Sequence, residues 1–265
     1  MLNQIYIDNI INTALFEDIN YIDVTTDNLI DDSHQSSAYF IAKDSGVLCG
    51  IDIAARVFEL AGGNVETEIL LKDGTQVKKG DVIANLKGST KTLLKGERTA
   101  LNLLQHMSGI ATAANKCVRL AEGTNAKITD TRKTLPGLRA LQKYAVTVGK
   151  DNHIDAYGSI TAAVRALREK AGHMLKIEVE VRTFEELKEA LDCGCEIIML
   201  DNMSTEDMKK AVEITAGRAK LEASGNITLD NLRETALTGV DIISLGALTH
   251  SVKCFDISMR IKTAE

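Results

Sequence analysis

Charged residues stand directly after an apolar stretch in the segment TDTRKT, residues 129–134. Asp130, Arg132 and Lys133 end a strand expected over residues 126–131. A guanidinium can bind a carboxylate or phosphate through two parallel hydrogen bonds, and an ammonium adds a compact positive charge. The segment is therefore a candidate anion-binding loop, although a solvated charged turn has the same composition.

Three acids fall on two successive strands. In KIEVEV the side chains alternate between the faces of a strand, so Glu178 and Glu180 share one face. Buried carboxylates need partners, and Lys133, Lys150 or a metal ion could supply them. Asp201, at the end of the next strand, could join them around Mg²⁺, a cation that favours carboxylate oxygens. A purely structural network of ion pairs is the alternative.

Two turns of small residues follow the last two expected strands. EASGN contains Ser224, Gly225 and Asn226, and SLGALTHS contains Gly246 and His250. Each turn leads into an expected helix. Backbone N–H groups and a helix dipole at such a place bind phosphate well, and in parallel barrels functional sites lie where the strands end.

Secondary-structure elements must bring these residues together. From residue 126 onward, the sequence predicts strands and helices in regular alternation. Strands alternating with helices through short loops indicate a parallel sheet, here a barrel. Ser or Thr followed by acids, as in STEDM and TFEEL, is typical of helix N-caps. Strands are expected over 126–131, 175–181, 196–200, 219–224 and 241–246, and helices over 138–146, 159–172, 183–194, 204–217 and 228–239.

The rhythm breaks once. Between the helix that ends near Val146 and the helix that starts near Ser159, only TVGKDNHIDAYG stands where a strand should be. Parallel sheets do not normally place two helices in a row without a returning strand. Either the barrel is irregular at this point or a strand is missing from the sequence.

The first hundred residues differ from the rest. Residues 38–50 and 52–62 are expected to form a strand with a turn and then a helix, and short β-type runs with Gly at the turns follow. A long helix over 96–123 is expected to link this α+β half to the barrel. Arg98 opens this expected helix beside Glu97.

Composition limits the classes of function. The chain has 265 residues with 45% hydrophobic residues, enough for one barrel or two unequal domains. A net charge of −6 disfavours general nucleic-acid binding but leaves room for a local basic pocket. No basic N-terminal segment or long apolar run predicts a signal peptide or membrane span. Five scattered cysteines indicate reduced thiols and a cytoplasmic location.

Several motifs together resemble the quinolinate phosphoribosyltransferase family, also called nicotinate-nucleotide pyrophosphorylase (carboxylating). The similarity covers nearly the whole chain in order, and DTRKTLPGLRALQKYAV is highly specific. The motifs are ERTALNLLQHMSGIAT, TDTRKTLPGLRALQKYAV, KDNHI, IEVEV, MLDNMS, LEASGNI and ISLGALTHS.

The resemblance implies a fold and a reaction. The family makes nicotinate mononucleotide for NAD biosynthesis from quinolinate and phosphoribosyl pyrophosphate, with Mg²⁺, and releases pyrophosphate and carbon dioxide. The implied fold is an N-terminal α/β sandwich over residues 1–105, joined by the C-terminal tail 252–265, and an incomplete α/β barrel over 106–251. The implied assembly is a homodimer with shared active sites, or a higher oligomer.

The resemblance also implies roles for individual residues. Arg98 would reach the quinolinate of the neighbouring subunit, and Lys150 would lie beside the substrate. Glu180 and Asp201 would serve the magnesium ion and the ribose. The remaining residues are expected to bind the substrate carboxylates, the pyrophosphate and the 5′-phosphate: Thr131, Arg132, Lys133, Ser224, Gly225, Asn226, Gly246 and His250.

One departure from the family lies at the break in the rhythm. The family carries a Gly-rich loop with Asn-His-Arg and then a barrel strand between YAVTVG and KDNH, where this sequence passes from Gly149 to Lys150. The His and Arg of that loop would bind quinolinate. We expect the natural chain to carry these residues. A true deletion would favour a non-catalytic, ligand-binding relative, and a paralogue acting on another acidic ring is a further alternative.

Overall fold

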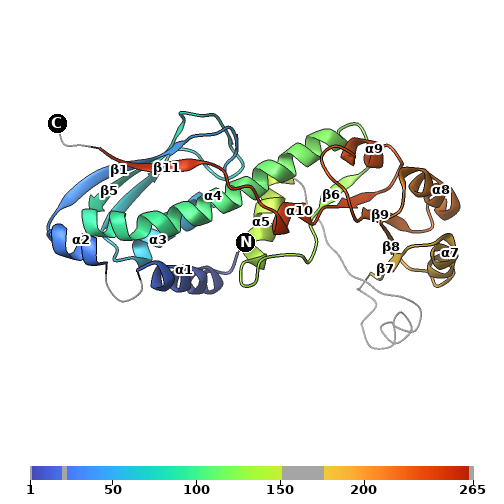
Figure 1. Ribbon diagram of the computed structural model, residues 1–265, viewed down its shortest axis with the longest axis horizontal. Coiled ribbons are helices and arrows are strands. Elements are labelled where there is room, and N and C mark those ends of the chain that lie inside the picture. Colours follow the sequence, from blue (N-terminus) through green and yellow to red (C-terminus); the bar gives the residue numbers. More distant parts are fainter. Residues whose placement is uncertain (1, 20–22, 151–175, 263–265) are drawn as a thin grey trace. The chain divides into compact units, whose positions relative to one another are not determined.

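A computed structural model describes residues 2–19, 23–150 and 176–262 of the chain (Figure 1). The chain divides into two compact units. The first contains Met1–Asn115, Thr134–Asp151 and Ser251–Glu265, and the second contains Lys116–Lys133 and Asn152–His250.

The first unit is built on an antiparallel sheet with the strand order β11-β1-β5-β3. Side chains of β1 alternate, and Ala38, Phe40 and Ala42 on one face are buried. The C-terminal strand pairs with β1 from Ser37↔Lys262 onward, so the chain end completes this sheet. The strands are β1 (Gln35–Ala42), β3 (Val65–Ile69), β5 (Val82–Ser89) and β11 (Ile257–Lys262), beside a small pair of β2 (Gly46–Val47) and β4 (Gln76–Val77).

Helix α3 (Ile51–Leu60) packs its apolar side on the sheet. Val57 and Phe58 are fully buried, and the Phe58 ring lies 6.1 Å from the ring of Phe40. Asp73 caps the helix, because its Oδ1 accepts hydrogen bonds from the backbone N–H groups of Gly50 and Ile51 at 2.8 and 3.0 Å. A short helix, α2 (Val24–Leu29), precedes the sheet.

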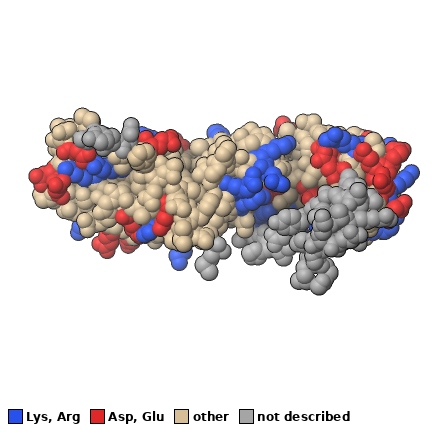
Figure 2. Space-filling model, turned by 90° about the horizontal axis from the view of Figure 1, so that it is seen from below, with Lys and Arg blue, Asp and Glu red and all other residues tan. Residues whose placement is uncertain are grey.

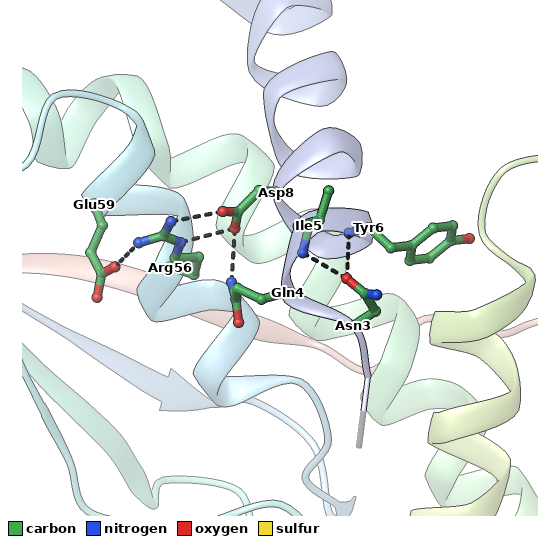
Figure 3. A network of polar contacts seen from close by, with 7 residues as sticks. All are labelled: Asn3, Gln4, Ile5, Tyr6, Asp8, Arg56 and Glu59. Carbon is green, nitrogen blue, oxygen red and sulfur yellow. Dashed lines mark hydrogen bonds and ion pairs between the residues drawn. The ribbon is translucent and has the colours of Figure 1, made fainter.

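Helix α1 (Gln4–Ile19) docks on α3 through polar contacts, which Figure 3 shows. The Arg56 guanidinium binds both oxygens of Asp8, at 3.0 and 2.8 Å, and also pairs with Glu59. Asn3 begins the helix by accepting a hydrogen bond from the N–H of Ile5 at 2.9 Å. The bidentate Arg56–Asp8 contact fixes the orientation of α1 as well as its position.

Helices α4 (Thr90–Ala121) and α5 (Arg139–Lys150) approach each other closely near the end of α5. A Cβ on Gly149 would stand 2.3 Å from the carbonyl oxygen of Ala111, so only glycine fits there. Buried Gln142 of α5 contacts His106 of α4, with Nε2 atoms 3.0 Å apart. His106 is therefore a packed helix histidine.

The second unit is built on a parallel sheet with the strand order β6-β10-β9-β8-β7. Helices stand between successive strands, and the first strand pairs with the last, as in a barrel. The predicted fold class, an N-terminal sheet domain and a parallel α/β domain, is confirmed. The elements are β6 (Lys127–Thr129), β7 (Glu178–Val181), α7 (Phe184–Asp192), β8 (Ile197–Asp201), α8 (Thr205–Thr215), β9 (Lys220–Ser224), α9 (Leu232–Ala236), β10 (Ile242–Ser244) and α10 (Ala247–His250).

The open position in the described sheet lies between β6 and β7, the point at which the sequence rhythm breaks. The motif KDNHI beyond Lys150 and the helix expected over 159–172 lie outside the described residues.

The two faces of the parallel sheet differ in polarity. Val179, Val181 and Ile198 are buried on one face, and α7 contacts the sheet at β7. Glu180 and Glu222 lie on the other face, because both stand level with Met199 in the strand register. The prediction that Glu178 and Glu180 share a face is consistent with the alternating burial of β7.

The expected helix caps are present. Thr183 and Glu186 form a reciprocal capping box at the start of α7, and the Ser204 hydroxyl accepts a hydrogen bond from the N–H of Asp207 at the start of α8. The long helix begins at Thr90, earlier than the expected residue 96, so Arg98 lies within α4 rather than at its start. Within the described ranges, no helix has the length and apolarity to span a membrane.

Candidate active site

The candidate site lies at the carboxyl ends of the parallel strands. The register places Asp201 of β8 beside Ser224 of β9, and Thr129 of β6 beside Ser244 of β10. The loops that carry the predicted polar residues therefore begin at the same edge of one sheet. This edge is where parallel α/β folds place their functional groups.

Glu180 and Asp201 meet a common partner, Arg182. Its Nη2 lies 2.6 Å from Oε1 of Glu180 and its Nε lies 3.0 Å from Oδ2 of Asp201. The Asp201 side chain is 16% exposed, whereas the Arg182 side chain is 68% exposed. Hydrogen bonding to Asp201 and the charge of Glu180 raise the pKa of Arg182. One guanidinium thus contacts both carboxylates.

The turn after β9 is shaped by an asparagine from the neighbouring strand end. The N–H of Asn202 donates to the carbonyl of Ser224 at 2.9 Å, and its Oδ1 accepts from Nδ2 of Asn226 at 2.9 Å. A Cβ on Gly225 would stand 2.3 Å from that Oδ1, and Gly225 has φ of +86°. The turn therefore requires glycine for space and for backbone conformation.

The turn after β10 is covered by two side chains. A Cβ on Gly246 would stand 2.9 Å from Cδ2 of His250 and 3.3 Å from Cδ of Lys133. The imidazole and the lysine stem therefore converge on this glycine. This convergence joins the TDTRKT segment after β6 to the turn after β10.

Both turns offer backbone donors. Within the described part of the chain, the N–H groups of Gly225, Asn226, Gly246 and Ala247 make no hydrogen bond. Such groups can bind the oxygens of a phosphate. The expected contribution of helix dipoles is small, because α9 has five residues and α10 has four.

The TDTRKT segment is a local turn. The Thr131 hydroxyl accepts a hydrogen bond from the N–H of Lys133 at 3.1 Å, and Arg139 donates to the Thr134 hydroxyl at 2.9 Å. Arg132 and Lys133 are exposed. The two adjacent cations therefore lie at the solvent-facing surface of this segment.

A second pair of carboxyl groups lies deeper on the same face. Burial and the neighbouring Glu178 raise the pKa of Glu222 to about 8, and burial also raises the pKa of Glu178. Oε1 of Glu178 is a buried oxygen without a hydrogen-bond partner among the described residues. The raised pKa therefore favours the protonated form of Glu222 at neutral pH.

The structure brings most of the predicted residues to one sheet edge, but two of them lie elsewhere. Arg98 is exposed on α4, and Lys150 is the last, half-buried residue of α5. Both belong to the first unit. In the sequence Lys150 lies in the stretch where an expected strand is missing, whereas the described chain continues helix α5 to this residue.

Sequence reasoning missed two contacts. Arg182 follows β7 directly, and it is not among the partners expected for the strand carboxylates, which are Lys133, Lys150 or a metal ion. Its position two residues after Glu180 was the available signal, because residues i and i+2 share a strand face. Thr249, inside the motif SLGALTHS, has a buried hydroxyl that reaches Lys133 at 2.9 Å, and no sequence pattern indicates this contact.

The charge on the surface is distributed unevenly. Figure 2 shows a group of Lys and Arg side chains in the centre of the view, while acidic and basic side chains are interspersed elsewhere on that face. A net charge of −6 therefore coexists with a local concentration of positive charge. An anionic ligand is attracted by such a local field rather than by the net charge.

Comparison with known families gives two matches that together cover most of the chain. The N-terminal domain of quinolinate phosphoribosyl transferase matches residues 23–108. The C-terminal domain of the same family matches residues 110–149 and 150–260, and the match is interrupted between Gly149 and Lys150.

Relatives extend over the full chain. A probable nicotinate-nucleotide pyrophosphorylase (carboxylating) of Bacillus subtilis is 42% identical over 275 residues, which cover 98% of this chain and 95% of the relative. The nicotinate-nucleotide pyrophosphorylase (carboxylating) of Mycobacterium leprae is 40% identical over 270 residues, covering 94% and 95%. Both alignments are longer than the 265 residues of this chain, so both contain positions at which this chain has no residue.

Solved structures of the same family have a similar fold. A NadC deletion mutant has a TM-score of 0.92 at 36% identity and covers 100% of this chain and 99% of its own. The nicotinate-nucleotide pyrophosphorylase of Francisella tularensis has a TM-score of 0.91 at 36% identity, covering 99% and 98%. With matching domains, relatives and fold, this chain belongs to the quinolinate phosphoribosyltransferase family.

Proposed function

We propose that the protein is a carboxylating nicotinate-nucleotide pyrophosphorylase of NAD biosynthesis. It joins quinolinate to the ribose of phosphoribosyl pyrophosphate and releases pyrophosphate and carbon dioxide. The observation that carries the proposal is the convergence of Lys133 and His250 on the Gly246 turn, at the same sheet edge as Glu180 and Asp201. Cationic groups and carboxylates are both needed there, because the substrates are anions and the ribose becomes positively charged during transfer.

The chain's own groups have separable tasks. The N–H groups of Gly225 and Gly246, which have no hydrogen-bond partner among the described residues, suit the oxygens of a 5′-phosphate. Arg132 and Lys133 supply positive charge for the pyrophosphate and the carboxylates of quinolinate. Glu180 and Asp201 are placed to stabilise positive charge on the ribose as the bond to pyrophosphate breaks.

We expect Glu180 and Asp201 to hold Mg²⁺. The donor set fits, because the two carboxylates contact one guanidinium and Mg²⁺ is commonly held by one or two carboxylates together with substrate phosphates. When bound, the ion supplies positive charge that offsets the charge of the leaving pyrophosphate.

We also expect a homodimer that acts in the cytoplasm, in which Arg98 of one subunit contacts quinolinate in the other. Arg98 is exposed on α4, where Glu97 is its charged neighbour. An exposed arginine on a helix outside the parallel sheet is available to a second copy.

The test is product formation. Purified protein with quinolinate, phosphoribosyl pyrophosphate and Mg²⁺ should form nicotinate mononucleotide and carbon dioxide in equal amounts, measured by mass spectrometry and release of labelled carbon dioxide. Nicotinate in place of quinolinate is the control, because it lacks the 2-carboxyl group that quinolinate loses as carbon dioxide. Failure to form product with either ring, by folded protein of natural length, would exclude the proposed activity.

The interruption between Gly149 and Lys150 favours one other reading. If the chain truly lacks the loop that the family carries there, it is a ligand-binding relative without turnover. It would then bind phosphoribosyl pyrophosphate in calorimetry but form no mononucleotide. A paralogue for another acidic ring would form product only with that ring, and a panel of pyridine and pyrimidine carboxylates would identify it.

A further inference from the structure

The hydroxyl of Thr249 links two of the loops of the candidate site. Thr249 is fully buried in α10, and its Oγ1 lies 2.9 Å from the carbonyl oxygen of Lys133 and 3.3 Å from that of Gly246. A hydroxyl has one proton to donate. The shorter contact, to Lys133, therefore receives the stronger hydrogen bond.

This hydrogen bond lies beyond the end of a strand pair. The ladder between β6 and β10 ends at Thr129↔Ser244, with one further hydrogen bond from the N–H of Leu245 to the carbonyl of Thr129 at 3.0 Å. Four residues beyond Leu245, the Thr249 hydroxyl donates a hydrogen bond to the carbonyl of Lys133, which lies four residues beyond Thr129. The loop of residues 130–133 is thus fixed at both ends against the segment after β10.

The position of the Lys133 backbone determines where its side chain can lie. The lysine stem lies over Gly246, with Cδ 3.3 Å from the place of a Cβ on that glycine. The Lys133 side chain itself is exposed, so the buried contact of the residue is made by its backbone carbonyl. Losing the Thr249 hydrogen bond would free the loop to swing the ammonium away from the turn.

We propose that Thr249 is a positioning residue that holds Lys133 against the Gly246 turn, so that the ammonium and the backbone N–H groups contact the same phosphorylated substrate. The proposal rests on the proposed function and adds a residue to it. Thr249 is fully buried, so its effect on the substrate is expected to be indirect. Its contribution passes through the shorter hydrogen bond, to the Lys133 carbonyl.

The competing explanation is structural, in which the hydroxyl only satisfies a buried polar position. The two explanations predict different effects of a Thr249 substitution in a protein that also carries Lys133→Ala. If Thr249 acts through Lys133, its substitution should have no further effect on ligand binding once the lysine side chain is absent. If its role is structural, both backgrounds should respond equally.

The experiment compares Thr249→Val and Thr249→Ser, each alone and combined with Lys133→Ala. Thr249→Val removes the hydroxyl at nearly constant volume, and Thr249→Ser retains it. The measured quantity is the dissociation constant of phosphoribosyl pyrophosphate with Mg²⁺, determined by calorimetry, with the melting temperature recorded for each variant. Binding is measured apart from turnover, so a failure of the proposed catalytic activity is distinguishable from a failure of this proposal.

The expected result is a loss of affinity of about threefold to tenfold for Thr249→Val, the usual effect of one hydrogen bond. Thr249→Ser should stay within about twofold of the parent, and in the Lys133→Ala background Thr249→Val should add less than about twofold. Equal losses in both backgrounds would overturn the proposal, as would a parent protein that does not bind the ligand. If Thr249→Val does not fold, the same comparison is made with Thr249→Ala, and failure of Thr249→Ser to retain affinity is then also decisive against it.

Discussion

At the scale of single residues, Arg182 decides how the carboxylates of the site behave without ligand. Its guanidinium contacts Glu180 and Asp201 together. Two carboxylates close to one another repel, and a shared cation relieves this repulsion. A divalent cation at the same carboxylates would have to compete with the guanidinium for them.

Arg182→Ala should therefore strengthen Mg²⁺ binding. The ion would no longer displace a guanidinium, and the expected gain is about twofold to tenfold, because exposed ion pairs are individually weak. Calorimetric titration with Mg²⁺ measures it. Lys210→Ala is the matched control, because Lys210 forms an ion pair with Asp207 on α8 and its substitution also removes one positive charge. An equal gain in both variants would mean that only net charge matters.

Glu180→Gln and Asp201→Asn should reduce turnover by roughly a hundredfold, because each removes a negative charge that stabilises the positive charge developing on the ribose. The affinity for quinolinate should change little, since these acids face the sugar and not the pyridine ring. Steady-state kinetics and equilibrium binding of quinolinate separate the two quantities. Near-normal turnover in both variants would exclude the assigned role, and a loss of quinolinate binding would place the acids at the ring.

Glu222 should make stability depend on pH. Its pKa in the folded protein, about 8, lies above the ordinary value of 4.5, so the folded chain keeps a proton that the unfolded chain has lost. The contribution to the free energy of unfolding is therefore fully present below about pH 4.5 and is lost as pH rises to about 8. Glu222→Gln mimics the protonated form and should flatten this decline, which is on the order of a few kcal/mol.

Urea denaturation between pH 5 and pH 8.5 measures this effect. Glu189→Gln on α7 is the control, because Glu189 is exposed. If Glu222→Gln follows the same pH profile as the parent, the Glu222 carboxyl is ionised in the folded state and the assignment is incorrect.

At the scale of elements, the strands and helices of the parallel sheet were predictable because their signals are local. Alternation in KIEVEV and the capping residues Thr183 and Ser204 depend only on near neighbours in the chain. The partner of Glu180, by contrast, could have been any nearby cation. Distinguishing Arg182 from Lys133 or Lys150 requires the three-dimensional arrangement, as does the contact from Thr249 to Lys133.

The limits of helices were less predictable. Helix α4 starts at Thr90, and α5 continues through Gly149 to Lys150. Glycine inside a helix normally disfavours it by up to about 1 kcal/mol, so the sequence suggests an end near Val146. The close approach of Gly149 to Ala111 of α4 supplies tertiary packing that outweighs this preference.

The interruption after α5 leads to a prediction about the chain itself. A parallel sheet needs a strand between consecutive helices, and the family match is broken between Gly149 and Lys150. The intact natural protein should therefore exceed the 28.7 kDa of the 265-residue chain. Mass spectrometry with peptide sequencing should find the additional residues at this position. A well-folded natural protein with a mass of 28.7 kDa would show that the segment is truly deleted.

At the scale of the whole molecule, the division of the chain into two units poses a question about Arg98. Arg98 and Lys150 belong to the first unit, while the turns and acids at the strand ends belong to the second. In an enzyme with a symmetric dimer, a residue outside the parallel sheet can serve the site of the partner.

Arg98 should act on quinolinate bound in the partner subunit. A desolvated arginine facing a dianion makes a strong charge-assisted contact, and Arg98→Ala should weaken quinolinate binding by roughly 2–5 kcal/mol. Lys133→Ala should inactivate the subunit that carries it, since Lys133 lies at the strand ends of its own sheet. Chains carrying either substitution should be inactive alone.

Mixing the two kinds of chain makes the decisive measurement. If sites are shared, each mixed dimer has one site with both substitutions and one with neither. Random exchange then restores roughly a quarter of the parental activity, as the symmetry of a twofold dimer requires. Native mass spectrometry confirms that mixed dimers have formed. Mixed dimers without activity would show that Arg98 serves the site of its own chain or only stabilises α4, because an intact shared site would then be present yet inactive.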